Sequence, residues 1–322
     1  MATPLLGHHH HSKWGLKMDT SKLTLLFPRN PLRVSQPDPD YAEEYTVAKS
    51  MTNVRLINLD CLLDQNQLEL NTSFPSETTV IYRGWMLRPE TYSKMNSLIL
   101  ASGAKMLTDT HAYTGTHLLP SWAHHANTLK SAWTTDLSDK GIIRVLNQFS
   151  GPVTIKDFVK SRKHEWYSAF YIPNAQNFSQ ALEVIHNFIT RQGENLVGGL
   201  VIREFVPLLQ TGTYLSNNPT FEEYRVFYWQ RNPFVVIDYW GKNFESLNAN
   251  DQQFIKKQGA DIKSSFFTID FARKINGDLT IMEIGDAQVS GLQNFDVNHF
   301  MVVNKIDRTK NDMVMEDRKS VV

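Results

Sequence analysis

The chain has 322 residues, with 33 lysines and arginines balanced by 33 aspartates and glutamates, so its formal net charge is zero. This balance gives no overall attraction to nucleic acid or to an anionic membrane surface, and any anion site must be local. Apolar residues make up 41% of the chain, enough for one large or two ordinary domains. A single cysteine, Cys61, excludes an intramolecular disulfide and favours a cytoplasmic location. No apolar run reaches the length that a bilayer requires.

A proline-rich segment opens the chain. Residues 1–48 contain several prolines and few periodic apolar positions, which predicts a loosely ordered N-terminal arm. The four histidines of residues 8–11 are either a tag remnant or a polar tail, and we give them no functional role.

The next segment alternates between strand and helix patterns. Residues 78–85 are rich in β-formers and predict a strand. A helix is predicted to begin at Pro89 and to end at Gly103. Its buried face would comprise Tyr92, Met95, Leu98 and Leu100. With a further strand at residues 105–107, the pattern predicts a small α/β domain over residues 49–140.

From residue 141 onward the pattern is α+β. An amphipathic helix is predicted over residues 179–190, with its apolar positions facing inward. Strands are predicted at residues 153–156, 200–206, 223–229 and 234–239. These antiparallel hairpins with flanking helices define a second domain over residues 141–300, followed by a C-terminal tail over residues 301–322.

The most informative segment is a predicted β-hairpin over residues 266–284. Asn276 and Gly277 form a strong two-residue turn signal, and counting outward from them sets Asp270 directly opposite Glu283. Two like charges that face each other across strands are destabilising unless a cation or a proton lies between them. Because magnesium prefers carboxylate oxygens, this pair predicts a metal site. The alternative is a surface hairpin whose acids are exposed or paired with neighbouring basic residues.

Lys156 and Lys160 lie at the end of a predicted strand, four residues apart. Side chains at this spacing would leave the same face, so the two lysines would hold an anion such as phosphate. The alternative is a solvated basic loop.

Two further predicted strands carry charged residues. Arg203 and Glu204 end an apolar strand, a position that suits an adenine ring and ribose hydroxyls. Glu223 and Arg225 share one face of their strand, from which a phosphate clamp would project. The alternatives are a strand-terminal ion pair in the first case and a half-exposed sheet in the second.

In this order along the chain, these features resemble the ATP-grasp superfamily. Residues 151–162 (GPVTIKDFVKSR) look like the paired-lysine segment of its two-lysine clade, which includes the eukaryotic cell-division-cycle protein that promotes assembly of a translation initiation factor. Residues 283–292 (EIGDAQVSGL) look like the terminal segment of a prokaryotic and phage family within that clade. Residues 83–87 (RGWML) and 119–122 (LPSW) are similar to the domain that precedes it.

The resemblance implies an ATP-grasp fold, in which antiparallel sheets with flanking helices clasp a nucleotide cleft. Lys156 and Lys160 would contact the phosphates of ATP. Arg225 would bind the terminal phosphates, and Glu223 would orient it.

The resemblance also implies roles for the two ends of the cleft. The adenine and ribose end would be formed by Arg203, Glu204 and Val206. Asp270 and Glu283 would hold Mg²⁺ between the β- and γ-phosphates.

One position departs from the pattern of the superfamily. Many ATP-grasp proteins have asparagine two residues after the metal-binding glutamate, and this chain has Gly285 there. We therefore consider Asp286 and Gln288 as replacement metal ligands.

The activity that the resemblance implies is ATP-dependent carboxylate-amine ligation through an acyl phosphate. The carboxylate donor and the amine acceptor are not identified, and a protein or peptide acceptor is suggested only by the clade. One alternative is a covalent nucleotidyltransferase, because Lys156 and Asp157 superficially resemble the lysine motif of nucleic-acid ligases. Another alternative is a non-catalytic ATP-binding protein that chaperones a partner.

Several histidines fall near the predicted domain junction. A metal or acceptor site there would draw on His111, His117, His124 and His125. A polar helix-loop surface is the alternative, and Cys61 is interpreted as a small buried residue.

Overall fold

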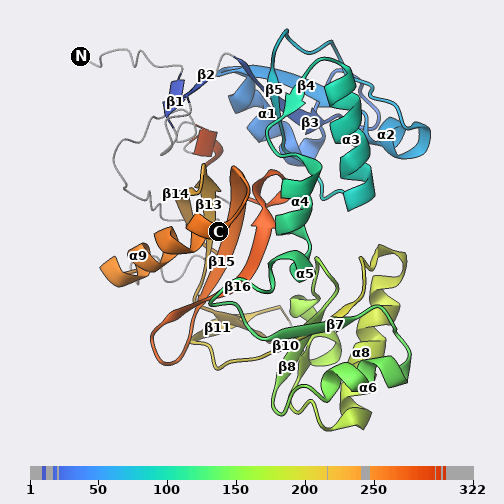
Figure 1. The fold of residues 1–322 in the computed structure, drawn as a ribbon, viewed down its shortest axis with the longest axis vertical. Coiled ribbons are helices and arrows are strands. Elements are labelled where there is room, and N and C mark those ends of the chain that lie inside the picture. Colours follow the sequence, from blue (N-terminus) through green and yellow to red (C-terminus); the bar gives the residue numbers. More distant parts are fainter. Residues whose placement is uncertain are drawn as a thin grey trace.

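The computed structural model describes residues 22–215, 217–240, 247–293, 295–298 and 300–301, together with the backbone of residues 9–11 and 17–19. The two short backbone segments pair as β1 (His9–His11) and β2 (Lys17–Asp19). His8 and residues 302–322 of the predicted C-terminal tail lie outside the described residues. The larger elements form three groups stacked along the long axis of the molecule (Figure 1).

The N-terminal group is a parallel sheet with strand order β4-β3-β5-β6. Its strands are β3 (Leu23–Pro28), β4 (Asn53–Ile57), β5 (Thr79–Tyr82) and β6 (Lys105–Met106). Its helices are α1 (Ala42–Lys49), α2 (Leu59–Gln65) and α3 (Pro89–Ala101). Helices that cross over between parallel strands cover both faces of such a sheet, so its strands are apolar along most of their length.

The predicted loosely ordered arm is wrong for residues 22–48. Strand β3 lies inside the sheet, between β4 and β5, and Leu26 and Phe27 are fully buried. The prolines that suggested an arm lie at the end of β3 and in the connection to α1. A short, continuously apolar run is typical of a buried parallel strand, but it has no periodicity by which it could be recognised.

Helix α3 begins at Pro89, as predicted, and ends at Ala101. Tyr92 and Met95 are buried as expected, but Leu100 is 64% exposed and Ile99 is buried in its place. Positions 92, 95 and 99 follow the helical period, whereas position 100 falls one step off that face.

The second group contains the antiparallel sheet β7-β10-β8-β9. Its strands are β7 (Ser131–Thr134), β8 (Val153–Lys156), β9 (Tyr171–Ile172) and β10 (Leu200–Glu204). The accompanying helices are α6 (Asp139–Leu146), α7 (Trp166–Ala169) and α8 (Phe178–Gln192). The helix predicted over residues 179–190 is α8, and its apolar face packs on this sheet.

The third group contains the hairpin β11 (Gln210–Tyr214) and β12 (Asn218–Phe221) and the antiparallel sheet β14-β13-β15-β16. The sheet consists of β13 (Glu223–Trp229), β14 (Asn232–Asp238), β15 (Phe266–Arg273) and β16 (Leu279–Asp286). Helix α9 (Ala249–Gln258) packs on one of its faces. Helices α4 (Thr110–His117) and α5 (Leu119–Trp122) run beside β16 and connect the first group to the second (Figure 1).

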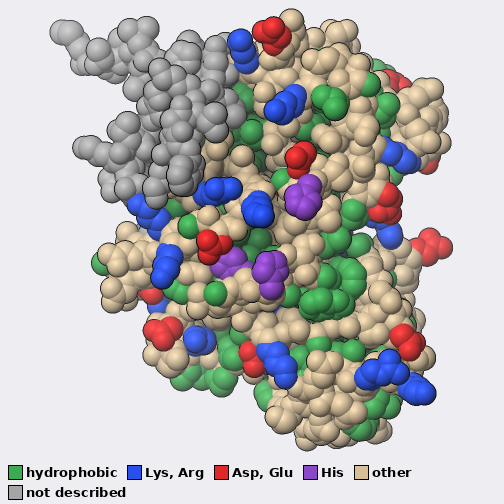
Figure 2. Space-filling view, viewed as in Figure 1, with side chains coloured by type: hydrophobic (Ala, Val, Ile, Leu, Met, Phe, Trp, Pro, Cys, Tyr) green, Lys and Arg blue, Asp and Glu red, His purple; other side chains and the backbone are tan. Residues whose placement is uncertain are grey.

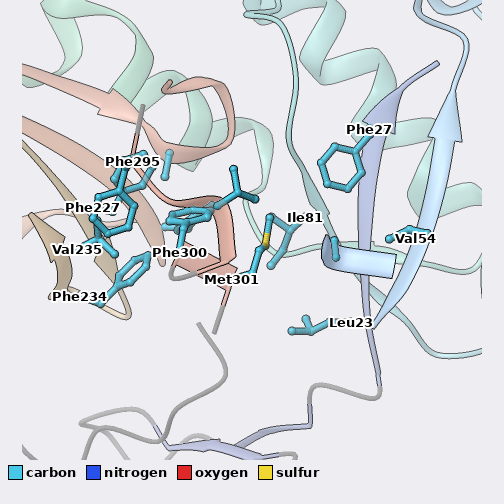
Figure 3. Close-up of a cluster of buried hydrophobic side chains, with 14 of the residues drawn as sticks. Leu23, Phe27, Val54, Ile81, Phe227, Phe234, Val235, Phe295, Phe300 and Met301 are labelled. Atoms are coloured by element: carbon cyan, nitrogen blue, oxygen red, sulfur yellow. The ribbon is translucent and has the colours of Figure 1, made fainter. Parts of the chain in front are cut away.

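The N-terminal sheet and the β13–β16 sheet share one hydrophobic core. Figure 3 shows Phe27 and Ile81 on one side of this core and Phe227 and Phe300 on the other. The charged face of the β13–β16 sheet is therefore held in a fixed relation to the helices that leave the N-terminal group.

The helices of the described residues are short. The longest, α8, has 15 residues, and none of them has the length and apolar character that crossing a membrane requires.

Candidate functional site

The hairpin of β15 and β16 places Asp270 directly opposite Glu283, as predicted. Asp270 is also opposite Arg225 of β13, so the three residues lie in one row across three adjacent strands. Side chains in such a row project from the same face of the sheet. This row is the centre of the candidate site.

Two deviations from the predicted hairpin cancel each other. The backbone N–H of Lys274 donates to the carbonyl oxygen of Asp278 at 2.8 Å, so the loop contains three residues, with Gly277 at φ 96°. A β-bulge between Asp270 and Phe271 then shifts the register by one residue. The predicted carboxylate pair is therefore correct, although the predicted two-residue turn is wrong.

Arg225 is bound to Asp270 in a bidentate ion pair. Its Nε and Nη2 donate to Oδ1 and Oδ2 of Asp270, each at 2.9 Å, and its Nη1 donates to the carbonyl oxygen of Gly291 at 3.1 Å. Burial alone would lower the pKa of Arg225, but Asp270 raises it above its usual value. Glu223, which we predicted to orient Arg225, instead accepts a hydrogen bond from Trp240 Nε1 at 2.6 Å. Asp270 therefore orients Arg225.

Lys156 forms the corresponding ion pair with Glu283. The distance from Lys156 Nζ to Glu283 Oε1 is 2.6 Å, and Lys156 is 5% exposed. Burial raises the pKa of Glu283, but Lys156 and Arg203 outweigh this effect and hold the pKa below its usual value. Each of the two facing carboxylates is thus ionised and carries its own cation.

Arg203 adds a further cation beside Lys156. Its Nη1 donates to the carbonyl oxygen of Met282 at 2.6 Å and its Nε to Ser131 Oγ at 3.0 Å, while its Nη2 is buried without a partner among the described residues. Burial lowers the pKa of Arg203 to about 10. The charged groups of Arg203 and Lys156 lie 5.5 and 5.9 Å from the ring centroid of Trp122, which comes from α5.

From the sequence we counted Lys163 only as background charge, but it is a residue of the cleft. Its Nζ lies 4.3 Å from the ring centroid of Tyr239. Burial by itself would lower the pKa of Lys163, yet Glu223, Tyr239 and Asp270 together raise it. The only sequence signal for this residue is its place in the basic run that follows β8.

Lys160, in contrast, is exposed and does not line the cleft. Strand β8 ends at Lys156, and the chain then turns so that the backbone N–H of Lys160 donates to Asp157 Oδ1 at 2.6 Å. This turn breaks the extended or helical geometry on which the prediction of a shared face rested. The same bonds occupy Asp157, which is fully buried.

The opposite end of the cleft is apolar. The cleft has a volume of about 170 Å³, and its apolar end is lined by Trp166, Phe170, Phe205, Phe221 and Met282. The ring centroids of Trp166 lie 5.1 Å from Phe170 and 5.7 Å from Phe205. A planar aromatic ligand, such as a purine, suits these surroundings.

The residues predicted for the adenine and ribose end lie close to it. Glu204 lines the cleft, and its Oε1 accepts a hydrogen bond from the backbone N–H of Lys130 at 2.9 Å. Val206 packs in the aromatic cluster around Trp166 but does not line the cleft, whereas its neighbour Phe205 does.

Asp286 does not join the carboxylates of the cleft. Side chains alternate along a strand, so Asp286 and Glu283 project to opposite faces of β16. Asp286 is fully buried, and its Oδ2 accepts two hydrogen bonds from Gln288, both at 3.1 Å. Gln288 Nε2 also donates to Tyr92 Oη at 2.9 Å. Both residues connect β16 to the N-terminal group, so neither replaces the missing ligand at Gly285.

Of the four predicted histidines, His117 alone lies near the ion pairs. It is 6% exposed and stacks on Tyr113 at 4.7 Å. Burial and the charge of Lys156 lower its pKa to about 4, so the ring is neutral. The other three line a different cavity, and no group of three or more histidine, cysteine or acidic side chains in the described part of the chain is arranged to hold a metal.

The fold and the cleft together define a nucleotide-binding protein of the ATP-grasp class. The profile of an ATP-grasp domain family, described as the third family of its clade, matches residues 142–304. This match spans half of the chain, and the chain belongs to this family. The predicted α+β fold is thereby confirmed.

Solved structures support the same fold. The ATP-grasp ligase PsnB, complexed with precursor peptide PsnA2 and AMPPNP, has a TM-score of 0.52 at 9% identity, covering 89% of this chain and 97% of that chain. The D-alanine-D-alanine ligase from Coxiella burnetii has a TM-score of 0.54 at 11% identity, covering 88% and 90%. D-cycloserine synthetase DcsG has a TM-score of 0.50 at 12% identity, covering 88% and 98%. No curated protein matches this chain.

The cleft residues fit a magnesium-bound nucleoside triphosphate. Arg203 Nη2 is a buried donor that still needs an acceptor, and a phosphate oxygen would satisfy it. Magnesium in phosphate-binding sites usually takes one or two carboxylates and completes its shell with phosphate oxygens and water. Asp270 and Glu283 supply that number, so a larger protein ligand set is not required.

Proposed function

We propose that this protein is an ATP-dependent carboxylate-amine ligase that acts through an acyl phosphate and uses a protein or peptide as one substrate. The proposal rests on the convergence, in one cleft, of two facing carboxylates, several cations from other elements and an apolar end. The PsnB structures, which contain a precursor peptide, support the peptide substrate. The kinship with the eukaryotic cell-division-cycle protein and with a phage family, and the cytoplasmic location, belong to this proposal.

The phosphates of ATP would be bound by the cations at the charged end of the cleft. These cations are Lys156, Lys163, Arg203 and Arg225. Asp270 and Glu283 would hold Mg²⁺, which supplies charge neutralisation and alignment of the phosphates. The aromatic end around Trp166 would take the adenine ring.

Binding of Mg²⁺ and ATP requires an exchange of ion-pair partners. In the structure Lys156 occupies Glu283 and Arg225 occupies Asp270. We expect both cations to move to phosphate oxygens while the two carboxylates turn to the metal. Every buried charge keeps a partner of opposite sign during this exchange, which limits the desolvation penalty.

The chemistry consists of two displacements. In the first, a carboxylate oxygen of the donor attacks the γ-phosphorus, the bond to the β-phosphate oxygen breaks, and ADP leaves. In the second, the amine nitrogen attacks the acyl carbon, phosphate leaves with the electrons of the C–O bond, and the amine gives up a proton. Arg225 and Lys156 stabilise the charge on the phosphoryl oxygens during the first step, and no covalent nucleophile is needed from the protein.

Two measurements test this proposal. Calorimetry with AMPPNP and Mg²⁺ reports nucleotide binding, and hydroxylamine traps acyl phosphates as hydroxamates while ADP is measured in the presence of a carboxylate mixture. We expect Lys156→Ala and Asp270→Asn to reduce both signals, whereas Lys140→Ala, an exposed lysine of α6, leaves them unchanged.

Three results would contradict the proposal. Full activity of either cleft variant would remove the cleft residues from the mechanism. AMPPNP binding without ADP formation in any carboxylate mixture would favour a non-catalytic ATP-binding protein. A labelled protein band that survives denaturing electrophoresis would favour a covalent nucleotidyltransferase.

A further inference from the structure

A second cavity, of about 310 Å³, lies between helices α4 and α5 and the segment that leads into β15. Its floor is apolar and is formed by Trp122, Ile262 and Ile284. Its rim is polar and includes His111, Ser121, His124, His125, Asp261 and Lys263. Figure 2 shows histidine side chains gathered near the middle of the face in view, over α4 and α5.

This pocket is separate from the nucleotide cleft. Ile284 follows Glu283 directly in β16, so the two side chains project to opposite faces of the sheet. The indole of Trp122 forms part of the wall between the two sites, because Lys156 and Arg203 lie over its ring and it also lines the pocket. A ligand in the pocket could not reach the γ-phosphate end of the cleft through this wall.

The rim carries hydrogen-bond donors that the protein leaves unused. His111, His124 and Lys263 make no side-chain hydrogen bond or ion pair with any described residue. Nε1 of Trp122 is buried and also lacks a partner among these residues. Buried donors in folded proteins normally have an acceptor, so the unused groups point to a ligand that supplies one.

The charge of the rim favours an anion. His125 Nδ1 lies 2.6 Å from the carbonyl oxygen of Ala126, and its Nε2 lies 3.1 Å from that of Gln258. Carbonyl oxygens only accept hydrogen bonds, so both contacts are satisfied together by the imidazolium form. With Lys263 this makes two positive charges against one negative charge, that of Asp261.

We propose that this pocket is a second ligand site, which binds a small apolar molecule that carries one carboxylate. The apolar part packs on the floor against Trp122 and Ile284, and the carboxylate accepts hydrogen bonds at the rim from His124 and Lys263. Because Trp122 also supports Lys156 in the cleft, occupancy of the pocket changes the affinity for nucleotide. By thermodynamic linkage, nucleotide changes the affinity of the pocket by the same factor.

A pair of matched probes tests the ligand chemistry. 3-Phenylpropionate and 3-phenylpropionamide have the same shape and differ in charge, and calorimetry on the full-length protein measures the affinity of each. We expect the carboxylate to bind about ten-fold more tightly than the amide. Lys263→Gln should abolish this preference, whereas Lys140→Gln on α6 should preserve it. Equal binding of the two probes, or binding of neither, would overturn the proposal.

Gly115 of α4 allows the pocket to be blocked without touching the cleft. It lines the pocket, and a Cβ added there meets no heavy atom within 4 Å. Gly115→Leu should fill the pocket and eliminate binding of 3-phenylpropionate, while Gly115→Ala should retain it. AMPPNP binding of both variants checks that the cleft is intact. Phenylpropionate binding that survives Gly115→Leu would refute the assignment, and this readout does not depend on the proposed ligase activity.

Discussion

Replacing Lys163 by methionine tests which lysines bind the phosphates. The ammonium group of Lys163 lies over Tyr239, and the carboxylates of Glu223 and Asp270 raise its pKa, so its charge belongs to the cleft. A hydrogen bond to a charged group contributes about 1.5–3 kcal/mol, which corresponds to a loss of about 10- to 150-fold in affinity. Methionine keeps the apolar stem over the ring and removes only the charge.

Lys160→Met is the matched control, because both lysines belong to the same basic run. Lys160 is exposed and does not line the cleft. A solvent-exposed charge contributes at most about 1 kcal/mol, so we expect a loss of about five-fold or less. Calorimetry with AMPPNP and Mg²⁺ measures both affinities, and thermal unfolding confirms that both variants are folded. The reasoning is refuted if Lys160→Met costs more than Lys163→Met, or if both variants bind as tightly as the unmodified protein.

Three further predictions concern stability. Arg273→Met removes the cation that binds two buried carboxylates, and it should lower the free energy of unfolding in urea by about 3–5 kcal/mol; a loss below about 1 kcal/mol would contradict this. Gly84→Ala should lower the melting temperature, because its Cβ would lie 2.4 Å from Tyr82 Oη, whereas Gly115→Ala in α4 meets open space and should stabilise the protein by up to about 1 kcal/mol; the reverse order would show that these backbone positions can adjust. Burial raises the pKa of Asp286 from 3.8 to about 7, so the folded chain keeps a proton that the unfolded chain releases above about pH 4. The stability linked to this carboxyl is present below pH 4 and is lost as the pH rises through 7, and Asp286→Asn should flatten this dependence; an unchanged slope of unfolding free energy against pH would exclude Asp286 as its source.

The sequence by itself determined the features that depend on near neighbours. The alternation of residues 266–271 and 279–284 around a glycine turn was enough to pair Asp270 with Glu283, because hairpin contacts are local. Strands β8 and β13 also lie where their patterns predicted. The order of these segments along the chain was enough to suggest the family. Burial of β3 was missed, because a continuously apolar strand has no period to detect.

Only the tertiary structure decided which charges meet. Lys156 and Glu283 are separated by 127 positions in the sequence, and their contact depends on how β8 packs against β16. The same packing brings Lys163 into the cleft, leaves Lys160 outside it and turns Asp286 toward the N-terminal sheet. Local patterns specify which face of an element a side chain occupies, but the partner across that face is set by the packing of distant elements.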